Sequence, residues 1–374
     1  MSPGGPLTAA LVASSYRLFL EALPLVANAQ GAFLSPVSIL FALALALNGA
    51  GPSSPTHAEL LGVISGAQPA PSEASLNSEL GRAMTLLSAP GGEDASFMLV
   101  ANSLWTNRGT QLKAEYVEQM KTIFQATAGP GGAADVNAWV SQATRGMITQ
   151  LLQSDDFDAV LANAIYFKGL WSHAFEKELT SERDFKTGAG ATKAVPMMHR
   201  EFEGPDRVPL ARKQGVYEAV ELPYKGDTFT AIALLPAEGV EVAVALKDFA
   251  AAPETFQLAS RTKIILPKFK VSSQMSLTPV LRHLGVKSAF GGSADFSRLS
   301  ASGLHISDVV HKAVVEVDEE GTVAAAATGV IMLTSLEIPS PPFELVFDRP
   351  FAFIIHHKPT GLPAFVGVVS DPSE

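Results

Sequence analysis

Residues 321–336, GTVAAAATGVIMLTSL, limit the possible folds of this chain more tightly than any other segment. The segment has no charged residue and no proline, and it lies between the acidic residues 318–320 and the proline-rich residues 339–342. Its alanines favour a helix, whereas residues 328–331 favour a strand or a loop. It can therefore join a β-sheet without obstruction. Uncharged segments of this kind are normally buried or they aggregate, so we expect any exposure of this one to serve a purpose.

Composition excludes several classes of function. The chain has 374 residues, of which 47% are hydrophobic, so it can form a large core. Its net charge is -10 and no basic run exceeds Arg212-Lys213, so neither nucleic acid nor an anionic membrane surface is an expected partner. The absence of cysteine excludes disulfides, thiol chemistry and thiolate metal sites.

Two apolar stretches bear on location. The longest apolar run, residues 39–47, is too short to span a bilayer. The N-terminal segment lacks a basic start and carries Arg17 and Glu21, so we interpret it as a first helix and not as a secretion signal. This interpretation favours an intracellular protein. An extracellular location stays open if the chain is a processed form.

Hydrophobic periodicity predicts helices in the first half of the chain and strands in the second. Ser35 as N-cap and Pro36 at the first helical position mark a helix that is apolar nearly all round, so we expect it to be central. Strands should dominate residues 217–275, and a glycine-rich turn is expected at 129–132. This order predicts an α+β fold with large sheets. The other predicted elements are helices at 73–88, 113–124, 136–152 and 276–284, and strands at 96–106, 159–171, 311–319 and in the C-terminal segment.

Enzyme signatures are missing from the sequence: it has no G-x-S-x-G elbow, Walker loop, H-E-x-x-H motif or dinucleotide fingerprint. His356 and His357 are neighbours on a predicted strand and so point to opposite faces, which favours a strand-edge or partly buried pair over a metal site. His311 lies among apolar residues and is expected to be a hydrogen-bonded core histidine. We therefore expect no catalytic residue, no metal and no cofactor. A hydrolase that uses His311 or His356 with a serine is the enzymatic alternative, and no motif supports it.

Taken together, the motifs point to a family. The sequence resembles the serpin family along nearly its whole length, which implies one serpin domain over residues 1–374. The resemblance implies a large central β-sheet, two further sheets, eight or nine helices and an exposed reactive loop at about residues 319–342. The motifs, in the order of the family, are FLSPVSILFALALALNGAG, ANSLWTN, VNAWVSQATRGMI, AVLANAIYFKGLW, ELPYKGD, LPKFKV, ADFSRLS, VVHKAVVEVDEEGT, DRPFAFIIHHKPTG and VGVVSDP.

The resemblance implies an inhibitor of serine proteases, not an enzyme. A protease cleaves the reactive loop, forms an acyl-enzyme, and stays covalently attached while the cut loop inserts into the central sheet as a new strand. The intact protein is then metastable, because about a dozen new hydrogen bonds worth roughly 0.5–1.5 kcal/mol each become available on insertion. The expected state is a monomer that can form loop–sheet polymers. A non-inhibitory serpin acting as a carrier or chaperone is the alternative.

The hinge of the loop matches the inhibitory pattern. In the family the face that contains Thr322 turns inward, and here every alternate residue after it is small or apolar. Val323 departs from the acidic residue common at its position, but that position faces outward. We expect Thr322→Arg to turn inhibitor into substrate with little loss of initial stability. The hinge residues are Glu319, Glu320, Gly321, Thr322, Val323, Ala324, Ala325, Ala326 and Ala327.

Two further groups of residues carry over by motif. Trp171, Lys268 and Glu319 match the breach, where the loop enters the top of the sheet. The shutter is a polar cluster beneath the strands that separate, and its matching residues are Ser35, Ser38, Asn163 and His311. Ordinary core packing or helix capping is the alternative role for each of these residues.

The family count from Gly321 places the reactive bond at Ser335 and Leu336. A loop shorter by one residue selects Thr334, and a count back from DRPF selects Leu336, Glu337 or Ile338. A small residue at the reactive bond suits elastase-like or subtilisin-like targets. Trypsin-like targets are not expected, because no Lys or Arg lies between residues 321 and 342. Heparin binding is not expected either, since residues 73–88 carry only Arg82 against Glu73 and Glu79.

Overall fold

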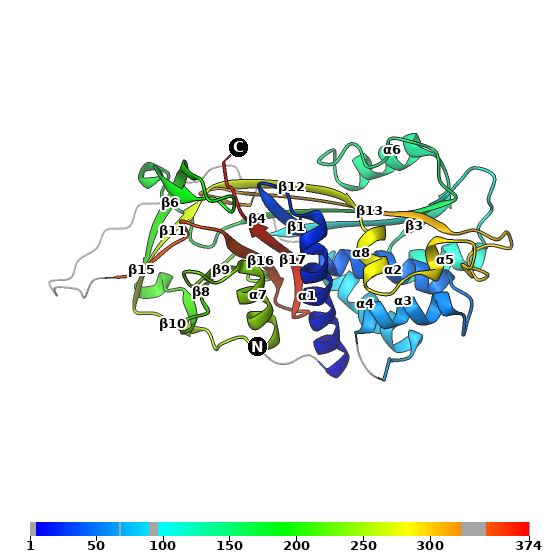
Figure 1. Cartoon of the computed structure of the whole chain (residues 1–374), viewed down its shortest axis with the longest axis horizontal. Coiled ribbons are helices and arrows are strands. Elements are labelled where there is room, and N and C mark those ends of the chain that lie inside the picture. The colour runs from blue at the N-terminus through cyan, green and yellow to red at the C-terminus, as the bar shows by residue number, and fades with distance from the viewer. Residues whose placement is uncertain (1–4, 67–68, 90–95, 323–341, 374) are drawn as a thin grey trace.

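The computed structural model describes residues 5–66, 69–89, 96–322 and 342–373, and these form eight α-helices and three β-sheets (Figure 1). The predicted α+β class with three sheets is confirmed. The helices are α1 (Pro6–Val26), α2 (Pro36–Gly49), α3 (Pro55–Ser65), α4 (Glu73–Leu87), α5 (Ala114–Phe124), α6 (Ala133–Ala143), α7 (Val242–Ala251) and α8 (Thr278–His283).

Two of the sheets are continuous. In the seven-stranded sheet every neighbouring pair is antiparallel. In spatial order its strands are β1 (Gly31–Leu34), β17 (Leu362–Val369), β16 (Phe351–His357), β9 (Phe229–Pro236), β8 (Tyr217–Pro223), β7 (Pro209–Lys213) and β10 (Gln257–Leu258). The four-stranded sheet contains β15 (Phe343–Val346), β11 (Arg261–Pro267), β6 (Thr192–Glu203) and β5 (Ser181–Lys186).

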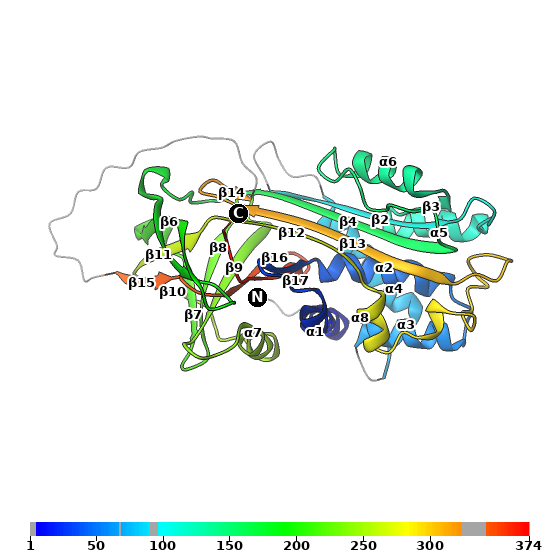
Figure 2. The same cartoon turned by 45° about the horizontal axis from the view of Figure 1, so that its top comes forward.

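The third sheet has six strands, and helices cover both of its faces. Figure 2 shows α6 over one face of its long strands and α2, α3 and α4 beneath the other. The buried residues divide accordingly, because α6 closes a small apolar cluster of its own while the main core lies on the opposite side. In spatial order the strands are β12 (Phe269–Ser276), β13 (Ile306–Val317), β14 (Gly321–Thr322), β4 (Ala159–Leu170), β2 (Phe97–Thr106) and β3 (Thr127–Pro130).

Helix α2 is central, as predicted. Ser35 caps it, because its Oγ accepts a hydrogen bond from the Ser38 N–H at 3.4 Å, and Pro36 follows at the first helical position. All residues of α2 are buried, so the uniform apolarity of this segment reflects contacts on every side.

The helix predicted over residues 136–152 is wrong in its second half, since α6 ends at Ala143. Thr144 Oγ1 donates to Val140 O at 2.7 Å and accepts from Ile148 N at 3.0 Å, and Gly146 adopts a positive φ of 81°. Ile148 is nevertheless buried in the cluster beneath α6. The apolar periodicity therefore predicted the burial of these residues correctly, but its prediction of a helix was wrong.

Two other predictions need correction. The turn predicted at 129–132 overlaps β3, which pairs in parallel with the end of β2. The strand predicted at 311–319 begins earlier, at Ile306, and ends at Val317. Strands dominate residues 217–275, as predicted, and α7 lies between two of them. Both errors concern a strand whose partner is distant in sequence.

The adjacent histidines do not lie at a sheet edge, so that part of the prediction is wrong. They are on β16, between β17 and β9, and both His356 and His357 are buried. Burial lowers the pKa of His357 to about 4, and the neighbouring His356 lowers it further. Among the described residues, no group of three or more metal-ligating side chains is placed to hold a metal ion.

Helix α1 is the one helix among the described residues that is long and apolar enough to span a membrane by length and composition. Leu11, Leu18 and Phe19 of this helix are buried in the main core. A core helix of a folded domain meets the same criterion, so length and composition alone do not assign α1 to a membrane.

Candidate functional site

The six-stranded sheet contains a long parallel pair at its centre. Strands β4 and β13 pair in parallel from Ala159 opposite Ile306 to Tyr166 opposite Val314, and we call this pairing the seam. The outer neighbours of the two strands, β2 and β12, are antiparallel to them. A strand placed between two parallel strands can be antiparallel to both of them. Antiparallel ladders are slightly more stable per residue than parallel ones. The other parallel pair of this sheet, β2 with β3, spans only four residues, so the seam is the long site at which one more antiparallel strand fits.

Strand β14 lies between β4 and β13 at the upper end of the seam. Its two residues are antiparallel to both neighbours: Gly321 is opposite Leu170, and Thr322 is opposite Gly169 on one side and Val317 on the other. Figure 2 shows β14 where the long strands of the sheet diverge. The chain therefore already enters the seam at its top.

The two residues of β14 fit this position closely. Gly321 has a φ of 152°, and a Cβ built on it would lie 2.0 Å from Gly169 O, so a larger residue cannot sit there without moving the backbone. Thr322 is fully buried, and its Oγ1 lies 2.8 Å from the Tyr224 hydroxyl. The expectation that Thr322→Arg costs little initial stability therefore does not hold, because this side chain is buried before any cleavage.

A tight turn directs the chain from β13 into β14. Asp318 Oδ1 accepts hydrogen bonds from the N–H groups of Glu320 at 2.9 Å and Gly321 at 3.1 Å. The Asp318 N–H in turn donates to Gly321 O at 2.8 Å. Burial raises the pKa of Asp318, although these hydrogen bonds oppose the shift. The turn thus aligns β14 between β4 and β13.

Glu319 anchors the same turn from the opposite side. Its Oε2 lies 3.0 Å from Lys268 Nζ, and its Oε1 accepts a hydrogen bond from Thr180 Oγ1 at 2.8 Å. Burial raises the pKa of Glu319, but the hydrogen bonds from Lys268 and Thr180 outweigh it and the net pKa is lowered. Glu320 pairs with Lys177. Charged contacts thus hold both glutamates of the turn.

Trp171 closes the top of the seam. It directly follows β4, and its ring stacks on Tyr224 with the centroids 4.3 Å apart. Its Nε1 donates to Asp318 O at 3.0 Å, and its backbone N–H donates to Glu320 O at 2.8 Å. The structure thus brings Trp171, Lys268 and Glu319 together around the hinge. Sequence reasoning missed Tyr224 and Thr180, although the ELPYKGD motif contained the tyrosine.

Halfway down, a buried hydrogen bond crosses the seam. His311 on β13 is opposite Asn163 on β4, and its Nδ1 donates to Asn163 Oδ1. The Ser35 N–H donates to His311 Nε2 at 3.2 Å, which assigns the proton to Nδ1. Burial lowers the pKa of His311 to about 3, so the imidazole is neutral at physiological pH. His311 is thus the hydrogen-bonded core histidine that the sequence predicts.

The cluster around His311 extends to the elements on both sides. Asn163 Nδ2 donates to Ser38 O at 3.1 Å and also to Asn102 Oδ1 on β2. Ser35 Oγ donates to Ala364 O on β17 at 2.6 Å. The four shutter residues predicted from sequence therefore form one network. Asn102 belongs to it too and was missed, although it lies in the ANSLWTN motif.

This network does not look like the active site of a hydrolase. Ser35 is fully buried, and its hydroxyl donates to a backbone carbonyl instead of pointing at His311. A nucleophilic serine must present its oxygen both to a base and to substrate. The cluster instead satisfies buried polar groups at a place where two strands meet.

The loop residues named from sequence lie outside the described residues. These are the reactive-bond residues Thr334, Ser335, Leu336, Glu337 and Ile338 and the hinge residues Val323, Ala324, Ala325, Ala326 and Ala327. The described chain resumes at Pro342, just before β15.

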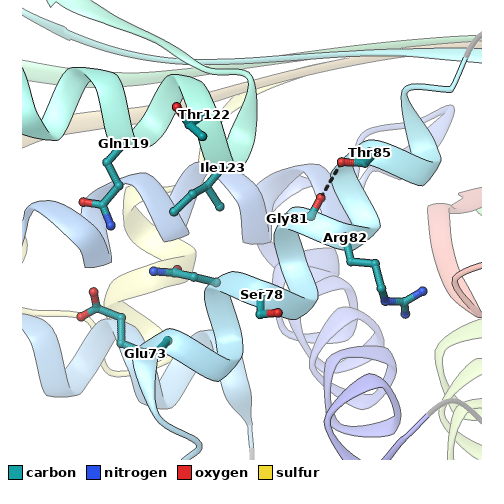
Figure 3. Close-up of a pocket in the computed structure, with 10 residues that line it drawn as sticks. Glu73, Ser78, Gly81, Arg82, Thr85, Gln119, Thr122 and Ile123 are labelled. Atoms are coloured by element: carbon teal, nitrogen blue, oxygen red, sulfur yellow. Dashed lines mark hydrogen bonds between the residues drawn. The ribbon is translucent and has the colours of Figure 1, made fainter.

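Helix α4, for which the sequence predicts no heparin binding, borders a groove with α5. The groove has a volume of about 550 Å³, and Figure 3 shows Gln119 and Ile123 from α5 facing it. Arg82, the one basic residue of α4, pairs with Glu79 at 2.7 Å. Glu73 also lines the groove and pairs with Arg298 at 2.8 Å. No cluster of free cations is therefore present on the described part of this helix.

Comparison with known proteins supports one family throughout. Residues 15–372 match the family model described as "Serpin (serine protease inhibitor)". The leukocyte elastase inhibitor of Bos taurus is 34% identical over 371 residues, covering 91% of this chain and 93% of that protein. The native structure of a thermophilic serpin, tengpin, superposes with a TM-score of 0.85 at 28% identity, covering 99% of this chain and 95% of that one.

Two other similar structures differ in what they bind. Native protease nexin-1 with heparin has a TM-score of 0.82 at 26% identity, covering 99% of this chain and all of that chain. Thyroxine-binding globulin complexed with thyroxine has a TM-score of 0.83 at 24% identity, covering 98% of this chain and 99% of that chain. At that identity the second likeness shows the fold alone.

Proposed function

Because this chain belongs to the serpin family, we propose that it is a suicide inhibitor of a serine protease that prefers small or apolar residues. The protease cleaves the loop and becomes acylated by it. The released strand then enters the seam between β4 and β13, and the attached protease is carried along and distorted before it can deacylate.

The position of β14 is the observation that carries this proposal. Its two residues are antiparallel to both strands of the seam, and they lie between β4 and β13 at its upper end. A strand that continues β14 would replace one parallel ladder with two antiparallel ladders. Each added backbone hydrogen bond is worth about 0.5–1.5 kcal/mol net, so insertion lowers the free energy substantially.

The composition of the loop supports the target class. Ser335 and Leu336 are the proposed reactive bond, and no Lys or Arg lies between residues 321 and 342. Shallow specificity pockets, as in elastase-like and subtilisin-like proteases, accept such residues. The likeness to leukocyte elastase inhibitor of Bos taurus agrees with this choice.

The experiment combines complex formation with stability. The intact chain is incubated with elastase, subtilisin, chymotrypsin and trypsin, and the products are separated on a denaturing gel. We expect a complex that survives denaturation with elastase or subtilisin and none with trypsin. A protease whose catalytic serine has been blocked beforehand is the control, because it cannot form the acyl bond. Failure of every active protease to give a resistant complex would refute the proposal.

A carrier function predicts a different result. The loop would be cut without complex formation, and the cut chain would unfold at the same denaturant concentration as the intact chain. An inhibitor instead gains a strand on cleavage and becomes markedly more resistant to denaturant. Unfolding curves before and after limited cleavage therefore separate the two functions.

A further inference from the structure

The lower end of the seam carries a group of contacts that the proposed function does not yet use. Strands β4 and β13 begin side by side there, at Ala159 and Ile306. Just before them, Asp158 Oδ2 lies 2.8 Å from His305 Nδ1. The Asp158 N–H donates to Ser307 Oγ at 2.9 Å. We call Asp158, His305 and Ser307 the seam clasp, because their contacts join the two strands across the seam.

An irregularity in the pairing of β4 with β13 places the residues of the clasp. Ala159 and Val160 are consecutive, but their partners Ile306 and Asp308 are not, so Ser307 is an extra residue at a bulge in β13. A bulge re-aims side chains, and here the Ser307 hydroxyl accepts the Asp158 N–H. On the other side, the N–H of Asn107, which follows β2, donates to Asp158 O at 3.0 Å. Asp158 is thus anchored to the β2 side of the seam while it reaches the β13 side.

The register of β14 shows when an inserting strand would meet the clasp. Thr322 is opposite Gly169, and Asp158 precedes Gly169 by 11 residues. An antiparallel strand advances one residue for each residue of its neighbour, so it reaches Asp158 at the eleventh residue after Thr322. Cleavage after Ser335 releases 13 residues beyond Thr322. A loop of the proposed length therefore meets the clasp only near the end of insertion.

The clasp cannot survive complete insertion. Neighbouring strands lie about 4.8 Å apart, so a strand placed between β4 and β13 would separate them to about 10 Å. The contacts of Asp158 with His305 and Ser307 are 2.8 and 2.9 Å long and must break at that separation. An insertion that stops a few residues short leaves them intact.

We propose that the seam clasp governs the last step of loop insertion. In the intact protein it holds the lower ends of β4 and β13 together and slows entry of an uncut loop. After cleavage its rupture is the final event, so it affects how often the protease is trapped before it deacylates. This inference rests on the proposed inhibitory function.

The test compares the intact and the loop-cleaved protein in His305→Ala, with Asp158→Asn as a second variant. We expect the midpoint of guanidinium unfolding to fall for the intact form and to stay unchanged for the cleaved form, in which the clasp is already broken. The contacts are partly exposed, so we expect spontaneous conversion of the intact form on warming to be about two- to fivefold faster. The number of inhibitor molecules consumed per trapped protease should fall.

Glu316→Gln is the matched control. Glu316 Oε2 lies 2.7 Å from Lys270 Nζ, and this pair is partly exposed, at 52% for Lys270 and 42% for Glu316, against 38% for His305 and 48% for Asp158. It joins β12 to β13, which lie on the same side of the seam and stay together during insertion. We therefore expect Glu316→Gln to shift the intact and the cleaved midpoints equally.

The outcomes separate this inference from the function on which it rests. If His305→Ala shifts both forms equally, as the control does, the clasp is an ordinary surface contact and the inference is wrong while inhibition stands. If the unmodified chain gains no resistance to denaturant on cleavage and forms no complex, the proposed function fails and the clasp proposal fails with it.

Discussion

The seven-stranded and the six-stranded sheets both contribute residues to the main core, but only the first is antiparallel throughout, and we call it the complete sheet. Every neighbouring pair in the seven-stranded sheet is antiparallel, and the rings of Phe33, Phe353 and Phe365 pack along it. The six-stranded sheet has a parallel seam, and a strand of only two residues occupies its upper end. A strand inserted into the first sheet would be antiparallel to one neighbour and parallel to the other, because its neighbours run in opposite directions. Insertion into the seam would exchange one ladder for two.

The buried polar groups of the two sheets differ in the same sense. His311 in the seam uses both ring nitrogens, one toward Asn163 across the seam and one toward Ser35. His357 in the seven-stranded sheet bonds to Thr360 through Nδ1, and its buried Nε2 has no partner among the described residues. The histidine of the seam is thus fully hydrogen-bonded where β4 and β13 meet, although Asn102 Nδ2 of the same cluster also has no partner in the described part of the chain. The seven-stranded sheet keeps an unpartnered ring nitrogen among buried apolar side chains.

The largest effect is expected from a variant that blocks the upper end of the seam. In Thr322→Arg, a charged side chain replaces one that is fully buried against Tyr224. Burying the charge costs several kcal/mol, so insertion is slowed and the protease escapes by deacylation. We expect at least about a tenfold rise in the number of inhibitor molecules consumed per trapped protease, because about 1.4 kcal/mol in a barrier is tenfold in rate.

Titration of a fixed amount of protease with Thr322→Arg measures this change. Thr322→Ser is the control, since it keeps the hydroxyl that meets Tyr224 and adds no charge. We also expect Thr322→Arg to lower the stability of the intact chain, because the hinge must leave the sheet. Unchanged stoichiometry in Thr322→Arg would contradict the role of the seam.

The second prediction compares the effects of replacing a buried histidine in each of the two sheets. His311→Leu leaves Asn163 Oδ1 and the Ser35 N–H without these partners in a buried site, which costs about 1–3 kcal/mol. We expect this variant to unfold at lower denaturant and to form loop–sheet polymers faster on warming. His357→Leu removes a residue of similar burial from the complete sheet, so it should alter stability without accelerating polymerisation. Native gels after warming measure polymerisation, and equal rates in the two variants would remove the distinction.

The third prediction is a dependence of the free energy of unfolding on pH. Burial lowers the pKa of His311 to about 3, below its unfolded value of about 6.5. Between these values the unfolded chain binds a proton that the folded chain does not, so stability is lost as pH falls from about 6.5 toward 3. This contribution is fully present above the unfolded pKa. Its slope is about 1.4 kcal/mol per pH unit for each such histidine.

Denaturant unfolding at several pH values checks this slope in the intact chain and in His311→Leu. Between pH 4 and 6, the free energy of unfolding should change with pH less steeply in His311→Leu than in the unmodified chain. The difference should be about 1.4 kcal/mol per pH unit, which corresponds to one proton. His357, whose pKa is lowered to about 4, contributes a similar term that remains in the variant. An identical slope in both proteins would mean that His311 is not buried as a neutral group.

Local sequence predicted those elements whose own residues determine them. Ser35 and Pro36 specify the start of α2, and its apolar composition specifies its burial, so the helix was predicted correctly. The apolar residues 159–171 and 96–106 were predicted to be strands, and β4 and β2 occupy nearly these ranges. The end of α6 was missed because a side-chain hydrogen bond of Thr144, and not a proline or a capping glycine, ends it.

The candidate site was only partly predictable for the same reason. The family motifs pointed to His311 and Asn163, which lie 148 residues apart, and to Lys268 and Glu319. Nothing in the spacing pointed to Tyr224 beneath Thr322, 98 residues away, or to Asp158 beside His305. These contacts depend on which strands become neighbours, and short-range patterns carry little information about that.

The sequence alone determined the chemistry of this protein: an uncharged, proline-free segment behind a glycine hinge, no cysteine, and a family order of motifs. Only the tertiary structure decided where that segment can go, because strand pairing joins residues far apart in the chain. It placed β14 at the top of a parallel seam, His311 across its middle and the seam clasp at its foot. The physical reason is that side-chain periodicity is a local property, whereas the partner of a strand is set by the packing of the whole domain.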